Sequence, residues 1–278
     1  MRVSIIGVGL MGGSLGMALR KRLKAFVKGH VRREETGMKA VELGALDEWS
    51  LSLEESVKNA DYVFFATPVK SIINIFKEAQ PFLKKGTLVS DLGSTKRSIV
   101  REITPVLRDD LAFIGGHPMT GSEKSGIEHA RADLYEGATY ILTPVPPYDR
   151  GRIDELIEII KSLGANPFII DPEKHDLLVA LVSHLPYLIS VSLVKLLDED
   201  PEAEKVVAGN FRDLTRPASS DPTMWKDILR DNRDFIKGKL FKLYEIMVKV
   251  LEMKEEDLYQ FLSSIKNRRD SIFLTRLS

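Results

Sequence analysis

The stretch VSIIGVGLMGGSLGMALRKRL, residues 3–23, decides the fold. Its beginning is rich in β-branched side chains and predicts a buried strand, and its end has the apolar spacing of a helix. The glycines between fit the GxGxxG pattern of a dinucleotide-binding turn, in which the backbone approaches a pyrophosphate at a helix amino terminus. The alternative is a tight turn without a ligand. We expect a nucleotide cofactor to contact the residues of this turn, namely Gly7, Gly9, Leu10, Met11 and Gly12.

Beyond this stretch, short apolar runs alternate with longer segments that have helical spacing. The strand candidates are residues 25–31, 62–66, 87–90, 112–114, 138–142 and 167–170, and the helix candidates are 34–43, 69–82, 95–107 and 150–163. Strands that alternate with helices of this length predict an α/β domain with a doubly wound, mostly parallel sheet.

The pattern changes at Asp171. Asp171 and Pro172 suit the start of a helix, because aspartate caps free N–H groups and the first turn tolerates proline. The helix that follows, to about Leu197, is apolar nearly all round, as is typical of a helix buried on every side, and Pro186 should kink it. After it come only helix candidates, at 202–214, 222–230, 232–252 and 255–272.

We therefore expect a dinucleotide-binding domain over residues 1–171 and an all-helical domain over residues 172–278. The helical part is too small to cover its apolar central helix alone. A partner subunit should complete the core, which predicts a homodimer through this domain.

The composition excludes several classes of protein. The 278 residues are 44% hydrophobic, and 40 basic side chains balance 40 acidic ones, so no net charge favours nucleic acid or an anionic membrane. The absence of Cys and the presence of only five His argue against disulfides and a metal site. Glycines break the apolar amino terminus too early for a signal or membrane segment. We expect a cytoplasmic protein.

The stretch GGHPMTGSEKSG, residues 115–126, carries the densest chemistry. It follows a short apolar run, so His117 should lie at the carboxyl end of a strand, the edge where open α/β sheets bind ligands. A histidine there can act as a general base near neutral pH. The alternative is a polar turn whose side chains satisfy local backbone groups.

Two other strand ends point to the same edge. Thr67 and Pro68 follow one strand and would run beneath the nicotinamide half of the cofactor. Ser94, in DLGSTK, follows the next strand and would reach His117 and a substrate oxygen, unless Ser94 or Thr95 only caps a helix.

The end of the second strand indicates the cofactor type. An acidic residue there would bind a ribose 2′-hydroxyl and indicate NAD, but the sequence is GHVRR, residues 29–33. Arg32 and Arg33 suit a 2′-phosphate, which arginine can bind bidentately, so we favour NADP over NAD. The alternative is that both arginines face water or stack on the adenine.

The helical domain adds three candidates. His184 lies in the apolar helix, where a histidine is more often a core residue than a ligand. Arg212 and Arg216 lie one helical turn apart and would usually be solvated, although a dehydrogenase acting on an acid needs a fixed cation. Trp225 is either a core residue or part of the wall of the pocket in which such a cation would bind the substrate.

Together, GxGxxG, DLGSTK, GGHPMTGSEKSG, SHLPYLIS and DLTR resemble the prephenate and arogenate dehydrogenase family of tyrosine biosynthesis, over nearly the whole chain. The resemblance implies a Rossmann domain followed by a helical domain that interlocks two subunits. It also implies metal-free oxidative decarboxylation, with hydride transfer to NAD(P) and aromatisation of the ring as the driving force. In the family's pattern, His117 accepts the hydroxyl proton, Ser94 hydrogen-bonds His117 and that hydroxyl, and Arg216 binds a substrate carboxylate. The resemblance also implies active-site positions for four further residues, which match positions that line the family's active site: Ser122, Glu123, His184 and Trp225.

The resemblance leaves alternatives open. No residue decides between prephenate and arogenate as substrate, and the basic GHVRR departs from the NAD-preferring members. A β-hydroxyacid dehydrogenase is a second possibility, but it would use a lysine in a glycine-bearing motif on the long helix, and residues 177–194 contain neither. A regulatory protein that senses NADP without turnover is a third, although sensing requires no proton acceptor.

Overall fold

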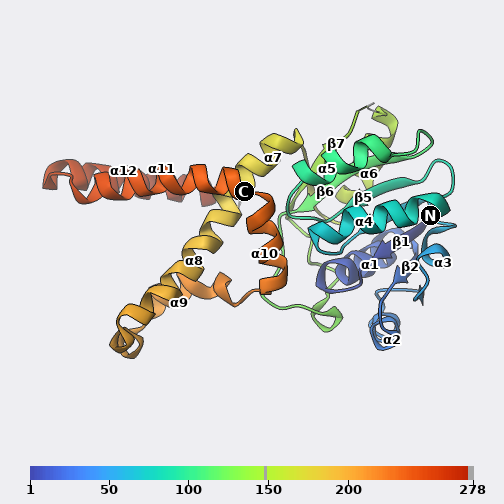
Figure 1. Ribbon diagram of the computed structural model, residues 1–278, viewed down its shortest axis with the longest axis horizontal. Helices are drawn as coiled ribbons and strands as arrows, with labels where there is room; N and C mark the ends of the chain where they lie inside the picture. Colours follow the sequence, from blue (N-terminus) through green and yellow to red (C-terminus); the bar gives the residue numbers. More distant parts are fainter. Residues whose placement is uncertain (147–148, 275–278) are drawn as a thin grey trace.

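The computed structural model describes residues 1–146 and 149–274. Within them, one sheet has the strand order β3-β2-β1-β4-β5-β6-β7-β8, and every neighbouring pair is parallel except β6 and β7 (Figure 1). The strands are β1 (Arg2–Ile6), β2 (Phe26–His30), β3 (Glu48–Ser50), β4 (Tyr62–Phe65), β5 (Leu88–Asp91), β6 (Ala112–Pro118), β7 (Thr139–Pro144) and β8 (Asn166–Ile169). The predicted doubly wound, mostly parallel sheet is confirmed.

Helices cover both faces of the sheet. One face packs against α1 (Leu10–Leu23), α2 (Glu34–Glu42) and α6 (Arg150–Ser162), and the other against α3 (Leu53–Val57), α4 (Val69–Ala79) and α5 (Arg97–Ile103). Successive strand residues point to opposite faces, so Phe64 joins the first hydrophobic core and Phe65 the second. The sequence analysis missed β3 and α3, each five residues or shorter.

The strand β6 is longer than predicted. We expected it to end at Ile114, but it continues to Pro118 because antiparallel β7 pairs with it as far as Pro118. Glycine is required here, since a Cβ on Gly116 would lie 2.4 Å from the carbonyl oxygen of Asp91. The alternative of a polar turn is wrong for His117, which lies in the strand one residue from its carboxyl end, but it holds for Ser122, whose hydroxyl accepts the N–H of Lys124.

A continuous helical rod begins the remainder of the chain. It consists of α7 (Pro172–Val179), a π-helical turn (Ala180–His184) and α8 (Leu185–Leu196). The Asp171 side chain accepts hydrogen bonds from the N–H groups of Glu173 and Lys174, as the predicted cap requires. The irregularity expected from Pro186 is the π turn that precedes it, because proline lacks an N–H and its ring crowds the preceding turn.

Further helices follow this rod. They are α9 (Gly209–Thr215), α10 (Pro222–Asp231), α11 (Arg233–Leu251) and α12 (Glu255–Leu274). The single helix expected over 202–214 is wrong, because a 3₁₀ segment at Pro201–Val206 precedes α9. In Figure 1, α11 and α12 project from the sheet as one arm, and α8 and α9 as another. Residues 275–278 of the predicted helical domain lie outside the described residues.

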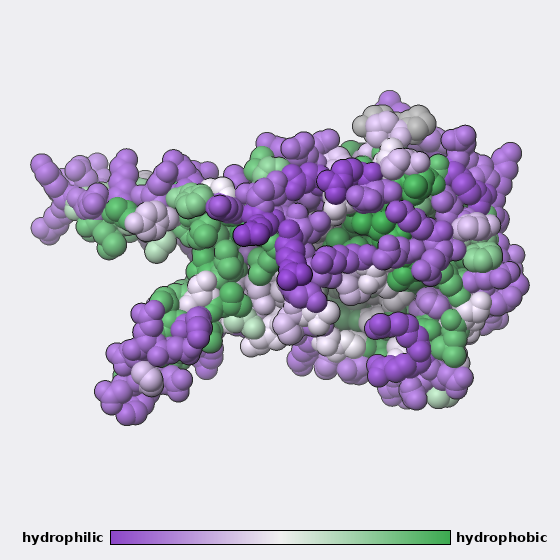
Figure 2. Space-filling model, viewed as in Figure 1, coloured by the Kyte–Doolittle hydropathy of each residue, from purple (hydrophilic) through white to green (hydrophobic). Residues whose placement is uncertain are grey.

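The helical part leaves much apolar surface exposed. Val182 is 62% exposed and Leu196 54%, so the expected burial of the central helix on every side is not achieved within one chain. Pro172–Glu199 is long and apolar enough to cross a membrane by length and composition alone, and a third of its most apolar window is buried. Figure 2 shows hydrophobic surface on the sides of the two arms that face each other.

Candidate active site

The glycine turn after β1 has the geometry that a dinucleotide requires. Gly7 has φ +94°, which favours glycine, and a Cβ on Gly12 would lie 2.1 Å from the carbonyl oxygen of Gly7. Gly9, which precedes α1, is different, since a Cβ there would meet no protein atom within 4 Å. The first and third glycines thus serve the tight turn and the helix–strand packing, and the second leaves space for a pyrophosphate at the helix amino terminus. Leu10 and Met11 form the first turn of α1.

Thr67 and Pro68 border this turn from β4. A Cβ on Gly7 would lie 2.8 Å from the Thr67 methyl group, so the two loops are in contact. Pro68 precedes α4. The Thr67 hydroxyl is buried and has no hydrogen-bond partner among the described residues. The strand order reverses between β1 and β4, which is where open α/β sheets bind their ligands.

The end of β2 carries no carboxylate. Its last residue is His30, and burial lowers the pKa of that imidazole, which stays neutral. Arg32 and Arg33 follow, both exposed, and no ion pair involves either of them within residues 1–146 and 149–274. Two unpaired guanidiniums thus lie where an NAD-binding turn would have an acid.

His117 is part of a buried hydrogen-bonded chain. Its Nδ1 lies 2.8 Å from Nε2 of His175, whose Nδ1 lies 2.7 Å from Oδ1 of Asp176. His117 is 8% exposed, and His175 and Asp176 are fully buried at the start of α7. Burial lowers the pKa of His117 well below its usual value, and His175, Lys96 and His184 lower it further, so His117 is neutral at physiological pH.

A buried ion pair supports this chain. Lys96 pairs with Asp91 at the end of β5, and both side chains are fully buried. Asp91 also accepts hydrogen bonds from the N–H groups of Gly93 and Gly116. The pair therefore ties the DLGSTK loop to the strand that carries His117.

Ser94 lies in this loop and is partly buried. Among the described residues no hydrogen bond joins it to His117, so that predicted contact remains a prediction. The alternative that Ser94 or Thr95 caps α5 is wrong, because Asp176 accepts the N–H groups of Lys96 and Arg97 instead. The Thr95 hydroxyl bonds Asp231.

His184 and Trp225 lie together in the helical part. Their rings meet edge to face at 6.0 Å, and Trp225 stacks on Tyr187 at 3.6 Å. Burial lowers the pKa of His184 to about 4, so the ring is neutral. Asn232 donates from Nδ2 to the carbonyl oxygen of Asp176 at 2.8 Å and lies 3.0 Å from His184 Nδ1.

These contacts leave two buried donors without a partner. The Asn232 amide group must donate to the carbonyl, so its second hydrogen faces His184 Nδ1, and the His184 proton is on Nε2. That Nε2 and the indole Nε1 of Trp225 are buried with no hydrogen-bond partner in the described chain. Both suit an acceptor oxygen on a ligand, because a buried unpaired donor is costly.

Arg216 and Glu123 form a solvent-accessible ion pair. Nη1 of Arg216 lies 3.1 Å from Oε2 of Glu123, with side chains 66% and 36% exposed. The Glu123 pKa is lowered by a hydrogen bond within its own residue and then by Arg216. Ser122 is also exposed, and its hydroxyl accepts the N–H of Lys124 at 3.2 Å. The structure thus joins the HPMTGSEKSG loop to the segment after α9.

Sequence reasoning missed the partners of the two histidines. Neither His175, Asp176, Lys96 nor Asn232 was a candidate, although all four are buried polar residues within this network. A signal existed, since a His–Asp dipeptide lies in the second turn of a helix that is largely apolar beyond it, shortly after a strand. Despite these clustered polar groups, no set of three or more side chains placed to hold a metal ion occurs among the described residues.

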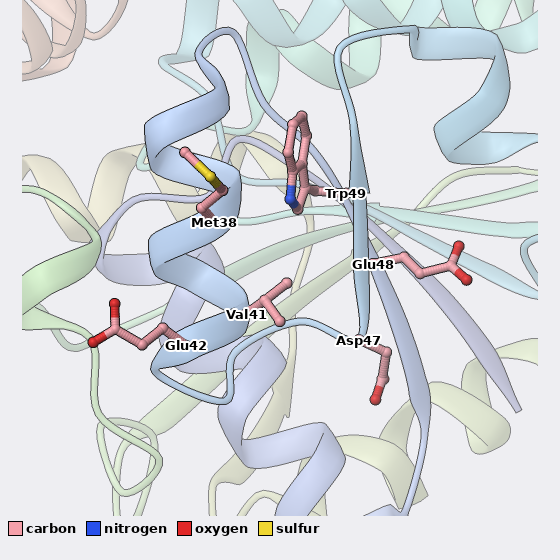
Figure 3. A pocket seen from close by; sticks show the side chains of 6 residues that line it. All are labelled: Met38, Val41, Glu42, Asp47, Glu48 and Trp49. Atoms are coloured by element: carbon pink, nitrogen blue, oxygen red, sulfur yellow. The ribbon is translucent and has the colours of Figure 1, made fainter.

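A separate groove lies between α2 and β3. Figure 3 shows its lining, in which Met38 and Trp49 face each other while Glu42 and Glu48 point outward. Asp47 and Glu48 lie at the amino end of β3. The groove therefore reaches the side of the sheet where the parallel strands begin, whereas His117 lies on the side where they end. We assign it no part in the chemistry.

Fold and site define the class of protein. The class is a nicotinamide-dependent dehydrogenase. Three features define it: a dinucleotide-binding turn where the strand order reverses, a neutral histidine at the same edge of the sheet, and a helical part beside that edge.

The comparisons with known proteins identify the family. The family description "Prephenate dehydrogenase, nucleotide-binding domain" matches residues 15–168, and "Prephenate dehydrogenase, dimerization domain" matches residues 171–266. The chain belongs to the prephenate dehydrogenase family. It is 34% identical to the prephenate dehydrogenase of Bacillus subtilis over 97% of this chain and 76% of that one.

Solved structures agree. Prephenate dehydrogenase from Aquifex aeolicus, in complex with hydroxyphenyl propionate and NAD+, is 34% identical with a TM-score of 0.87, covering 98% of each chain. Synechocystis arogenate dehydrogenase is 27% identical with a TM-score of 0.85, covering 98% of this chain and 100% of that one. A 3-hydroxyisobutyrate dehydrogenase, at 14% identity and a TM-score of 0.55 over 71% of this chain, shares the fold alone.

Proposed function

We propose that the protein is a prephenate dehydrogenase, which converts prephenate to 4-hydroxyphenylpyruvate and carbon dioxide with hydride transfer to NAD(P)+. Arogenate dehydrogenase, which would give tyrosine directly, is the alternative. The observation that carries the proposal is the neutral imidazole of His117 at the carboxyl end of β6, the edge that also holds the glycine turn. Family membership selects this substrate class over the β-hydroxyacids and over a sensing role.

His117 is the proton acceptor in this proposal. A neutral imidazole takes the proton of the ring hydroxyl while the carbon that bears it loses hydride, and the bound nicotinamide supplies the hydride-accepting position. Loss of the ring carboxylate as carbon dioxide makes the ring aromatic, which provides the driving force, and the phenolate oxygen takes the proton back from His117 to give the phenol of the product. Ser94, in the neighbouring loop, is proposed to hydrogen-bond the same hydroxyl.

The remaining substrate contacts follow from charge and burial. Arg216 is the proposed partner of a substrate carboxylate, since its ion pair with Glu123 is open to solvent and exchangeable. The unpartnered donors on His184 and Trp225 suit oxygens of the substrate. Ser122, exposed and adjacent to Glu123 in sequence, is proposed to lie at the entrance of the substrate site.

The decisive experiment crosses both substrates with both cofactors. Initial rates measured by nicotinamide absorbance, with prephenate or arogenate and NAD+ or NADP+, should be highest for prephenate. Turnover of arogenate alone would transfer the assignment to the alternative, and turnover of neither would refute it.

We infer a preference for NADP from the end of β2. His30 offers no carboxylate to a 2′-hydroxyl, and the exposed Arg32 and Arg33 suit a 2′-phosphate. Replacing both arginines by alanine should weaken NADP+ about 10- to 100-fold and NAD+ far less. Titration of the nicotinamide cofactors by calorimetry measures this, and an equal loss for both would refute the preference.

We also propose a cytoplasmic homodimer with a domain division after residue 171. The exposed apolar residues of the two arms, such as Leu196 at 54% on α8 and Met247 at 56% on α11, support a second copy as their cover. Sedimentation of the full chain tests this, and a monomer at micromolar concentration would contradict it.

A further inference from the structure

We propose that His175 and Asp176 are positioning residues for His117. Together they hold the proton of the neutral His117 ring on Nδ1, so that Nε2 is the nitrogen that accepts the substrate's proton. The inference rests on the proposed role of His117 and adds two residues to it.

The direction of the hydrogen bonds starts at Asp176. Its Oδ1 accepts the N–H of Lys96 at 2.8 Å and its Oδ2 that of Arg97 at 3.0 Å, at the amino terminus of α5. Two backbone donors and a helix amino terminus stabilise the ionised carboxylate. An ionised carboxylate only accepts hydrogen bonds, so His175 must donate to it from Nδ1.

The same reasoning fixes His117. Burial lowers the pKa of His175, so the ring is neutral and its single proton is the one directed at Asp176. Its Nε2 therefore carries a lone pair and lies 2.8 Å from His117 Nδ1. His117 Nδ1 must carry the proton, because two lone pairs at that distance would repel. The lone pair of His117 is then on Nε2.

The surrounding charges favour this arrangement. The groups that face His117 are Lys96 from the DLGSTK loop, His175 from α7 and His184 from the π turn. The positive charge of Lys96 is neutralised by its ion pair with Asp91. Asp176 therefore remains as the buried carboxylate that can stabilise the positive charge on His117 when that ring takes up a second proton. His175 transmits that stabilisation through its two nitrogens, in the manner of an orienting carboxylate in an acid–base triad.

The variants are chosen at His175, because Asp176 also caps α5 and changing it would disturb the fold. His175→Leu removes the acceptor for His117 at similar volume. His175→Gln retains an amide oxygen that can reach the Nδ1–H of His117. His175→Asn is shorter and keeps only the Asp176 contact, so it should resemble the leucine variant.

The test combines a spectroscopic and a kinetic measurement on the full chain. Nitrogen NMR of the imidazoles, recorded without substrate, should show a protonated Nδ1 on His117 in the wild type and in His175→Gln, and a mixture of tautomers in His175→Leu. The exposed His129 serves as the internal reference. Turnover should fall about 10- to 100-fold in His175→Leu and His175→Asn and recover in His175→Gln, with cofactor affinity unchanged.

Two results would overturn the proposal. One is an unchanged His117 tautomer in His175→Leu, and the other is a glutamine variant that loses as much turnover as the leucine variant. Because the NMR measurement needs no substrate, it tests the hydrogen-bonded chain even if the assigned reaction is wrong.

Discussion

The buried chain around His117, the interior of the proposed site, and the exposed ion pair of Arg216 with Glu123, its proposed mouth, place polar and charged groups in opposite environments. Around His117 the partners His175 and Asp176 are fully buried, whereas Arg216, the proposed carboxylate-binding residue, is 66% exposed. A buried chain keeps its geometry because breaking it leaves unpaired polar groups, whereas an exposed ion pair is weakened by solvent and opens easily. In the proposed function, the buried chain therefore fixes where the proton goes, and the exposed pair exchanges the Glu123 carboxylate for that of the substrate.

The largest expected effect tests the interior. His117→Asn should lower turnover about 100- to 10,000-fold, because it removes the proton acceptor. Affinity for the cofactor should be nearly unchanged, since the glycine turn is intact. Steady-state kinetics and cofactor titration measure the two quantities. Retention of turnover would show that the buried chain is structural only.

The second effect tests the mouth. Arg216→Ala should raise the Michaelis constant for the substrate about 10- to 100-fold, because a charge-assisted hydrogen bond to a carboxylate is lost. Arg212→Ala, an exposed arginine of α9, is the matched control and should leave the constant within about twofold. An unchanged constant in Arg216→Ala would remove that residue from the substrate site.

The third prediction concerns how the free energy of unfolding depends on pH, which should reflect the buried histidines and not the exposed ion pair. The pKa values of His117, His175 and His184 are all lowered by burial, so the unfolded chain takes up protons first as the pH falls. The free energy of unfolding should therefore decrease below about pH 6.5, by up to about 1.4 kcal/mol per pH unit for each histidine. Glu123, whose pKa is lowered, contributes nothing in this range.

Urea denaturation at a series of pH values measures this dependence. Stability that stays constant from neutral pH to about pH 5 would contradict the buried, neutral state of the three histidines. A variant lacking one of them should show a shallower slope.

The smallest effect concerns the partner of Arg216. Glu123→Gln should release the guanidinium for the substrate and lower the Michaelis constant by no more than about fivefold, because an exposed ion pair is weak. Kinetics at low salt would reveal it best. A large increase instead would mean that Glu123 itself holds the substrate.

Much of the fold was predictable because it depends on local pattern. The β-branched run before the glycines and the spacing of the helices are properties of neighbouring residues, and they predicted the sheet. The end of β6 was not predictable, because its last residues are held by pairing with β7, for example His117 with Ile141. Short elements such as β3 carry too few residues to form a pattern.

The site divides in the same way. His117 was predictable from its place after an apolar run. His175 was not predictable, because its hydrogen-bond partner His117 is 58 positions away in sequence. Polar residues are common near the start of any helix. The His–Asp pair therefore has no special significance in the sequence until the position of β6, which carries His117, is known.

The capping of α5 by Asp176 also limits how the molecule can be divided. A fragment that ends near residue 171 would expose the N–H groups of Lys96 and Arg97 to water, and Thr95 would lose Asp231. Chimaeras that exchange the cofactor-binding half between relatives must therefore transplant this loop and its caps as one unit. A recombination point between Arg97 and Asp176 would separate these partners, and one that keeps both sides of the contacts together would not.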